Sequence, residues 1–149
     1  MTEKNYLELF AKSFNWASFF LPKNTYRDCV KLYSFCRVLD DLVDEQTSLE
    51  LRTERFNKIK DVFEKRYKQE NYEEKLIGQS AHDSIVNNMV IIADNNNIKR
   101  IILDDLIEGV GSDLKPKVYL RSVKDLLVYS YRVAGTVGLM MAKLLNVDD

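Results

Sequence analysis

The chain has 149 residues, of which 46% are hydrophobic, and it carries 22 basic and 23 acidic side chains. A chain of this length is expected to form one domain that buries roughly two-thirds of its unfolded surface. Because the formal net charge is −1, no overall field favours nucleic acid or an anionic membrane, and we expect no nucleic-acid partner. Cys29 and Cys36 lack metal-ligand spacing and indicate reduced thiols.

The beginning of the chain and its longest apolar run bear on localisation. The first ten residues, MTEKNYLELF, carry Glu3 and Glu8 and lack the basic-then-apolar build of a signal peptide. The run over residues 133–145 is interrupted by Lys143 and is shorter than the roughly 20 residues that a spanning helix needs. We therefore predict a cytoplasmic protein, with peripheral contact to the inner membrane left open.

Five glycines, two prolines and no sustained period-two alternation predict an all-α fold with short connections. In chain order, helices are expected over residues 22–45, 47–67, 73–93, 98–110 and 123–145. Pro22 suits a first helical turn, and Thr47 with Glu50 forms a capping box for the second helix. Residues 111–117 are expected to form a loop, and Ser122 is the expected N-cap of the last helix.

The second half of the last predicted helix, VAGTVGLMMAKLL, is apolar on nearly all sides. Such a pattern is typical of a helix at the centre of a bundle. Gly135 and Gly138 each cost a helix about 1 kcal/mol relative to alanine. That cost is usually tolerated where something approaches the backbone closely. We expect either a neighbouring helix or a ligand chain at these two glycines.

The stretch CRVLDDLVDE, residues 36–45, places four carboxylates among aliphatic side chains. On a helix with 3.6 residues per turn, one polar stripe contains Tyr33, Arg37, Asp40 and Asp44. Apolar residues flank this stripe on both sides, whereas Asp41 and Glu45 lie off its edge. Spacing alone is typical of a solvated face. In a partly dry site, however, two ionised carboxylates need a cation or strong donors.

Arg37 can balance one of the two carboxylates, and a divalent cation would balance both. Magnesium binds through one or two carboxylates, keeps several waters and accepts phosphate oxygens as further ligands. Manganese is an alternative with similar preferences. The chain contains no Gly-rich phosphate loop, so a nucleoside triphosphate is a poor candidate. The pattern favours a diphosphate carried on an apolar tail.

Four sequence blocks resemble the squalene and phytoene synthase family, whose members join two prenyl diphosphates head to head. YSFCRVLDDLVDE resembles the first aspartate-rich motif, and KSFNWASFFLP resembles the N-terminal Ser-x-Ser-Phe region. LIEGVGSDL and YSYRVAGTVGLMM resemble two later blocks, and all four occur in family order. The resemblance implies an isoprenoid-synthase-type helical bundle with a central cavity, of which this chain would form about the first half.

The resemblance also implies roles for individual residues. Asp40 and Asp44 would hold Mg²⁺ that binds a diphosphate, and Arg37 and Ser13 would contact phosphate oxygens. Tyr129 would lie near the reacting carbons and complete the catalytic set with the two aspartates. The residues that would line the cavity or border the prenyl chain are Phe14, Tyr33, Val133, Gly135, Val137 and Gly138.

At the level of activity, the resemblance implies a Mg²⁺-dependent transferase that condenses two geranylgeranyl diphosphates to phytoene in carotenoid biosynthesis. Squalene or hydroxysqualene synthesis from farnesyl diphosphate is the alternative. The family carries a second aspartate-rich helix downstream of the VAGTVG block, and the terminal pair Asp148 and Asp149 is not that motif. A further alternative is therefore a non-catalytic or split subunit. Such a chain would expose an apolar face and would self-associate or bind a complementing C-terminal half.

Overall fold

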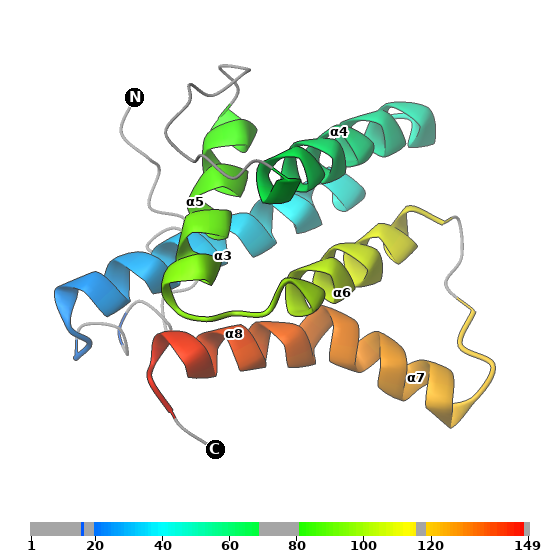
Figure 1. Ribbon diagram of the computed structural model, residues 1–149. Helices are drawn as coiled ribbons and strands as arrows, with labels where there is room; N and C mark the ends of the chain where they lie inside the picture. Colours follow the sequence, from blue (N-terminus) through cyan, green and yellow to red (C-terminus); the bar gives the residue numbers. More distant parts are fainter. Residues whose placement is uncertain (1–15, 17–19, 69–80, 116–118, 148–149) are drawn as a thin grey trace.

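The computed structural model describes residue 16 and residues 20–68, 81–115 and 119–147 (Figure 1). Every regular element in these ranges is helical, which confirms the predicted all-α class. In chain order the elements are α3 (Lys23–Asp44), α4 (Leu49–Lys68), α5 (Ala81–Asn95), α6 (Arg100–Gly111), the 3₁₀ turn η1 (Ser112–Leu114), α7 (Val123–Ser130), the π-helical turn η2 (Tyr131–Gly135) and α8 (Thr136–Leu144). Within the described ranges, none of the helices combines the length and apolarity needed to cross a membrane.

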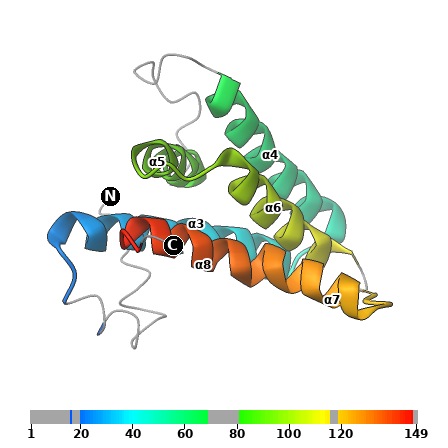
Figure 2. The same ribbon diagram turned by 60° about the horizontal axis from the view of Figure 1, so that its bottom comes forward.

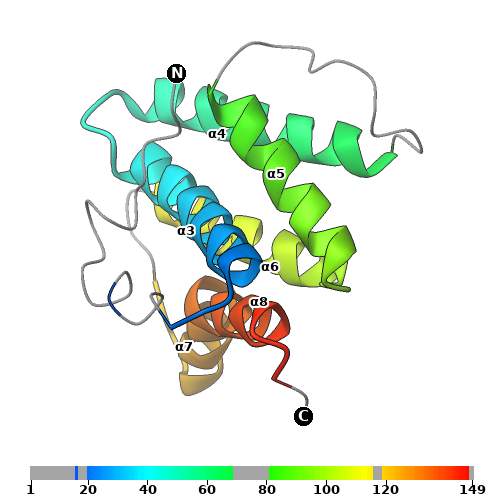
Figure 3. The same ribbon diagram turned by 90° about the vertical axis from the view of Figure 1, so that its left-hand side faces the viewer.

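Helix α3 occupies the centre of the core. It contacts α4, α5, α6 and α8, and Figure 3 shows α4 and α5 on one side of α3 with α7 and α8 on the other. Leu32, Phe35 and Leu39 of α3 are almost completely buried, because these neighbours cover three sides of the helix. Phe63 of α4 packs against Phe35, with 6.4 Å between the ring centroids. The central position that the sequence suggested for the last helix thus belongs to α3.

The helix ends predicted from the sequence agree with most of the observed helix ends to within a few residues. Ser122 accepts a hydrogen bond from the backbone N–H of Asp125 at 3.1 Å, so the predicted N-cap of α7 is confirmed. The predicted capping box at Thr47 is wrong. Ser48 accepts from the backbone N–H of Leu51 at 3.3 Å instead, because it directly precedes the first helical residue of α4. The first part of the helix predicted over residues 73–93 lies outside the described residues.

The last predicted helix is divided into three parts, because η2 interrupts it between α7 and α8. A π turn accommodates one extra residue and shifts the side chains that follow it around the helix axis. Arg132 of η2 pairs with Glu108 of α6 at 3.1 Å and lies 3.7 Å from Asp105. A Cβ at Gly109 would lie 2.6 Å from the Cβ of Arg132, so the glycine permits close packing of α6 against η2. No feature of the apolar periodicity marked this interruption.

Helix α8 is buried on one side only within the described structure. Thr136, Met140 and Leu144 are buried against α3 and α6, whereas Leu139 is exposed. Helix α7 contains no buried residue. Four apolar side chains at helical spacing form what we call the α7 stripe: Val123, Leu126, Leu127 and Tyr131, all of which are exposed.

The glycines in α6 and α8 are expected to respond in opposite ways to alanine. Gly138→Ala should raise the free energy of unfolding by about 0.5–1 kcal/mol, because among the described residues no atom beyond its own helix backbone and chain neighbours lies within 4 Å of the added Cβ. Gly109→Ala should lower it by about 1–3 kcal/mol, since the added Cβ would collide with Arg132. Urea unfolding of the two matched variants measures both effects. Equal changes would contradict the close packing of α6 against η2.

Candidate active site

Helix α3 runs alongside the α7–α8 segment in the opposite direction, which brings its acidic end towards α7 (Figure 2). At one end of this pairing, the Cys29 thiol of α3 donates to the Met141 sulfur of α8 at 3.6 Å. At the other end, the negative charge of Asp40 contributes to raising the pKa of Tyr129. The structure thus places two predicted catalytic residues that are far apart in the sequence within range of a charge interaction.

The acidic residues of α3 lie on its open side. Asp40, Asp41 and Asp44 are exposed, while their aliphatic neighbours Val38, Leu39, Leu42 and Val43 are buried. The aliphatic side chains therefore enter the core, and the carboxylates remain accessible to solvent and to a ligand. The sequence suggested a polar stripe between two apolar walls. In the described structure the apolar residues belong to the core and do not enclose the carboxylates.

Arg37 forms an ion pair with Asp41, with 2.6 Å between Nη2 and Oδ1. Asp41 lies off the predicted polar stripe, whereas the stripe aspartate Asp40 is affected by Arg37 through its charge, which acts to lower the pKa of Asp40. Asp41 is four residues ahead of Arg37, so a helical i, i+4 pair forms readily. Among the described residues, Arg37 is thus the cation that pairs within this group of three carboxylates, and these residues leave an excess of negative charge at this end of α3.

The pKa of Asp40 is raised above its ordinary value, and desolvation is the largest cause. Desolvation by surrounding groups raises the pKa of the Asp40 carboxyl, the positive charge of Arg37 lowers it, and the charges of Asp44, Asp41 and Asp113 raise it further. Together the raising influences prevail, so the ionised form of Asp40 is disfavoured in the folded chain. A cation bound at this position would reverse that balance.

Asp40 and Asp44 fit one side of a magnesium site. They are exposed carboxylates one helical turn apart, and the local charge favours a cation. In the described ranges, no three His, Cys, Asp or Glu side chains converge closely enough to hold a metal by themselves. The remaining ligands of a magnesium ion would have to be water, phosphate oxygens or groups outside these ranges.

Tyr129 is held by a carboxylate that the sequence analysis did not select. Its hydroxyl donates to both carboxylate oxygens of Asp113, at 3.1 Å each. Burial raises the pKa of Tyr129, and the hydrogen bond to Asp113, the charge of Asp113 and the charge of Asp40 raise it further. Asp113 lies in η1, within a segment predicted as a loop. A signal was nevertheless present, because Asp113 belongs to the LIEGVGSDL block.

The other predicted site residues lie on α3, η2 and α8 or outside the described structure. Tyr33 is half-buried on α3, and Gly138 is exposed on α8 with open space where a side chain would project. Ser13 and Phe14 lie outside the described residues. The three remaining predicted residues that border the prenyl chain are half-buried: Val133, Gly135 and Val137.

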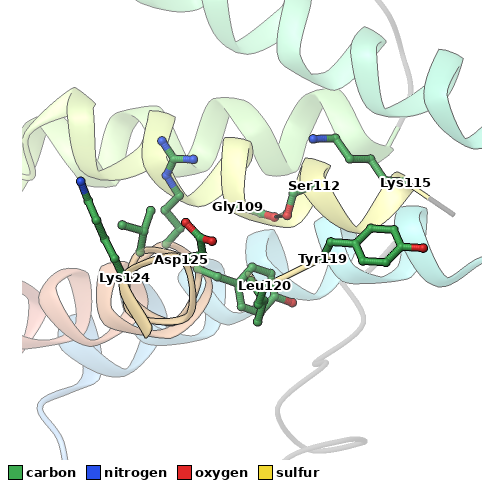
Figure 4. A pocket seen from close by; sticks show the side chains of 10 residues that line it. Gly109, Ser112, Lys115, Tyr119, Leu120, Lys124 and Asp125 are labelled. Carbon is green, nitrogen blue, oxygen red and sulfur yellow. Dashed lines mark hydrogen bonds between the residues drawn. The ribbon is translucent and has the colours of Figure 1, made fainter. Parts of the chain in front are cut away.

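A pocket of about 370 Å³ lies between α6, η1 and α7 (Figure 4). It is lined by Gly109, Ser112, Lys115, Tyr119, Leu120, Lys124, Asp125, Val128, Tyr129 and Arg132. Tyr129 is the one predicted site residue in this lining, and no residue of α3 takes part. The pocket is therefore next to the candidate site and distinct from the position of the α3 carboxylates.

The described residues form an all-α bundle with two aspartates one turn apart on α3 and a hydrogen-bonded tyrosine on α7, and this fold matches that of a dehydrosqualene synthase. The model of the squalene/phytoene synthase family matches residues 7–149, and the chain belongs to this family. This match confirms the resemblance that the four sequence blocks indicated. The reaction of the family is head-to-head prenyl transfer.

Individual relatives agree with this assignment. The chain is 31% identical over 147 residues to 15-cis-phytoene synthase from Pantoea ananas, covering 93% of this chain and 44% of the relative. It is 28% identical over 141 residues to the chloroplastic phytoene synthase of an Oncidium hybrid cultivar, covering 95% and 32%. The crystal structure of a dehydrosqualene synthase in complex with ligand is similar with a TM-score of 0.65 at 26% identity, covering 93% of this chain and 44% of that one.

The chain spans less than half the length of these relatives. This coverage agrees with the prediction that the chain forms only part of the family bundle. The exposed α7 stripe is consistent with the same conclusion, because the described residues leave every residue of α7 at least partly exposed.

Proposed function

We propose that the chain supplies the first aspartate-rich half of a head-to-head prenyl transferase that condenses two geranylgeranyl diphosphates to phytoene. The two exposed carboxylates of Asp40 and Asp44, one helical turn apart at the end of α3, carry this proposal. The two phytoene synthases from Pantoea ananas and a Paracoccus species, each 31% identical to the chain, favour phytoene over the farnesyl-derived products.

In this proposal, Asp40 and Asp44 hold Mg²⁺, with Mn²⁺ as a substitute, through their exposed carboxylates. The metal, when bound, neutralises the leaving diphosphate so that the allylic C–O bond can ionise. Arg37 is already near this end of α3 and would exchange its Asp41 partner for phosphate oxygens, joined by Ser13.

The prenyl chain is proposed to lie along the α7–α8 segment. Gly138 offers open space for it, and Val133, Gly135 and Val137 would border it on the same segment. Tyr129 belongs to the same segment, and its phenol is proposed to lie next to the carbons that react. Phe14 and Tyr33 would complete the lining, and the aromatic rings would stabilise cationic carbon through their faces.

A second candidate is a split subunit that needs a complementing C-terminal half for the second aspartate-rich motif. The α7 stripe favours it, because a row of four exposed apolar side chains is costly to leave in water. Either the helices of a complementing half or a second copy of the chain would cover the stripe. We place either form in the cytoplasm, with membrane contact only where an apolar product is released.

The test is to incubate the purified chain with Mg²⁺ and either geranylgeranyl or farnesyl diphosphate. Diphosphate release and the extracted product are measured by enzyme-coupled assay and chromatography. Phytoene from geranylgeranyl diphosphate supports the main proposal, and a C30 product from farnesyl diphosphate supports the alternative substrate. A folded chain that releases no diphosphate is not a complete enzyme. The intact mass of the native polypeptide then shows whether the second half is part of the same chain.

A further inference from the structure

We infer that Asp113 is a positioning residue for Tyr129, holding its phenol in the orientation that the prenyl transfer requires. The expected effect on catalysis rests on the proposed function, whereas the contact between the two side chains rests on their hydrogen bonds. The Tyr129 hydroxyl is 3.1 Å from each carboxylate oxygen of Asp113, and the two residues are 16 positions apart in the sequence. The contact therefore joins η1 to the last turn of α7 and is not a product of one helix.

Asp113 is anchored by the turn that contains it. The backbone N–H of Lys115 donates to the carbonyl of Ser112 at 3.2 Å and closes η1 around Asp113. The hydroxyl of Ser112 donates to the carbonyl of Gly109 at 2.6 Å and ties the turn to the last residues of α6. The carboxylate that receives the phenol is therefore presented by a bonded turn and not by a free loop.

Tyr129 is anchored through the helical segment that contains it. It lies in the last turn of α7, just before η2, where Arg132 pairs with Glu108 at 3.1 Å and packs closely against Gly109. Both partners of the hydrogen bond are thus attached to the end of α6, one through η1 and one through η2. A phenol fixed in this way loses little rotational freedom when substrate binds, which is the usual benefit of a preorganised site.

The hydrogen bond also determines which atoms of Tyr129 remain available. Its O–H proton is committed to the Asp113 carboxylate, so the phenol oxygen presents lone pairs, and not a proton, to anything else that approaches. A negative carboxylate beyond the proton makes that oxygen more electron-rich. Next to reacting carbons that pass through a cationic state, an electron-rich oxygen with a fixed position is favourable.

A double-mutant cycle in the full chain, with diphosphate release as the readout, tests the functional part. Asp113→Ala is expected to lower kcat about 10- to 100-fold with little change in KM, because misplacement of a reacting group affects the chemical step. Asp113→Asn keeps an acceptor oxygen and should recover most of kcat. In a Tyr129→Phe background, Asp113→Ala should have no further effect. The control is Asp61→Ala on the exposed surface of α4.

A measurement without substrate separates this inference from the proposed function. In a chain labelled with ¹³C at tyrosine Cζ, the Tyr129 signal is identified by its loss in Tyr129→Phe. Asp113→Ala should shift that signal, Asp113→Asn should shift it less, and Asp61→Ala should leave it in place. An unmoved signal, or a further fall of kcat in the Tyr129→Phe background, would overturn the inference. A wild-type chain without turnover would show that the chain is not a complete enzyme, and the signal alone would then decide the positioning role.

Discussion

Asp40→Asn is expected to remove Mg²⁺-dependent binding of a prenyl diphosphate and, at the same time, to make the folded chain slightly more stable. Loss of a ligand carboxylate should lower the metal affinity by at least about 10- to 100-fold, since even the loss of a group that only orients a ligand has an effect of that size. Titration calorimetry with Mg²⁺ and geranylgeranyl diphosphate measures the affinity, and urea unfolding measures the stability.

The gain in stability follows from the direction of the pKa shift. Desolvation and the charges of Asp44, Asp41 and Asp113 raise the pKa of Asp40 despite the opposing charge of Arg37, so ionised Asp40 is disfavoured in the folded state. A raised folded pKa means that this penalty is present above the folded pKa and absent below the unfolded value of about 3.9. Asparagine should therefore stabilise the chain by a few tenths of a kcal/mol at pH 7, after solvent screening, and the advantage should vanish near pH 4.

Asp41→Asn is the matched control for this experiment. It removes the same charge one residue further along α3, where the carboxylate pairs with Arg37 at 2.6 Å. We expect the control to retain most of the metal-dependent binding. Equal loss of binding in both variants would show that total charge, and not a specific pair of ligands, attracts the metal. A less stable Asp40→Asn chain at pH 7 would contradict the electrostatic account.

Leu127→Lys is expected to convert self-associated or partner-bound chain into free monomer. Leu127 is 64% exposed and Val123 is 74% exposed, so both are available to a covering surface. Burial of one leucine contributes about 1.5–3 kcal/mol, and its loss should weaken association about 10- to 100-fold. Sedimentation velocity over a range of concentrations measures the change. The monomer itself should unfold at the same urea concentration as wild type, because the side chain has few contacts to lose.

Ile101→Lys is the control for the α7 stripe. Ile101 is 59% exposed on α6 and is of similar size, but it does not belong to the stripe. We expect this variant to associate as the wild type does. Equal effects of the two lysines would show that association depends on general surface hydrophobicity. A wild-type chain that stays monomeric at about 100 µM would refute self-association, since an interface of ordinary strength is occupied at that concentration.

The sequence by itself was sufficient for the features that depend on one helix. The all-α class, the helix over α3 and the N-cap at Ser122 follow from periodicity and capping, which act over a few residues. The shared face of Asp40 and Asp44 could likewise be predicted from one helix, because helix geometry alone places side chains four residues apart on one face. The four family blocks could also be recognised from the sequence, since each is a continuous run of residues.

Only the tertiary structure decided the features that join separate segments. Asp113 meets Tyr129 across η1 and α7, and no period in the sequence relates positions 16 residues apart. The interruption of the last helix by η2 occurs where Arg132 packs closely against Gly109 of α6, a contact between segments that periodicity does not predict. The exposed side of α7 depends on which elements are present to cover it. Helical periodicity determines the face on which a side chain lies, whereas the packing of other segments determines what that face meets.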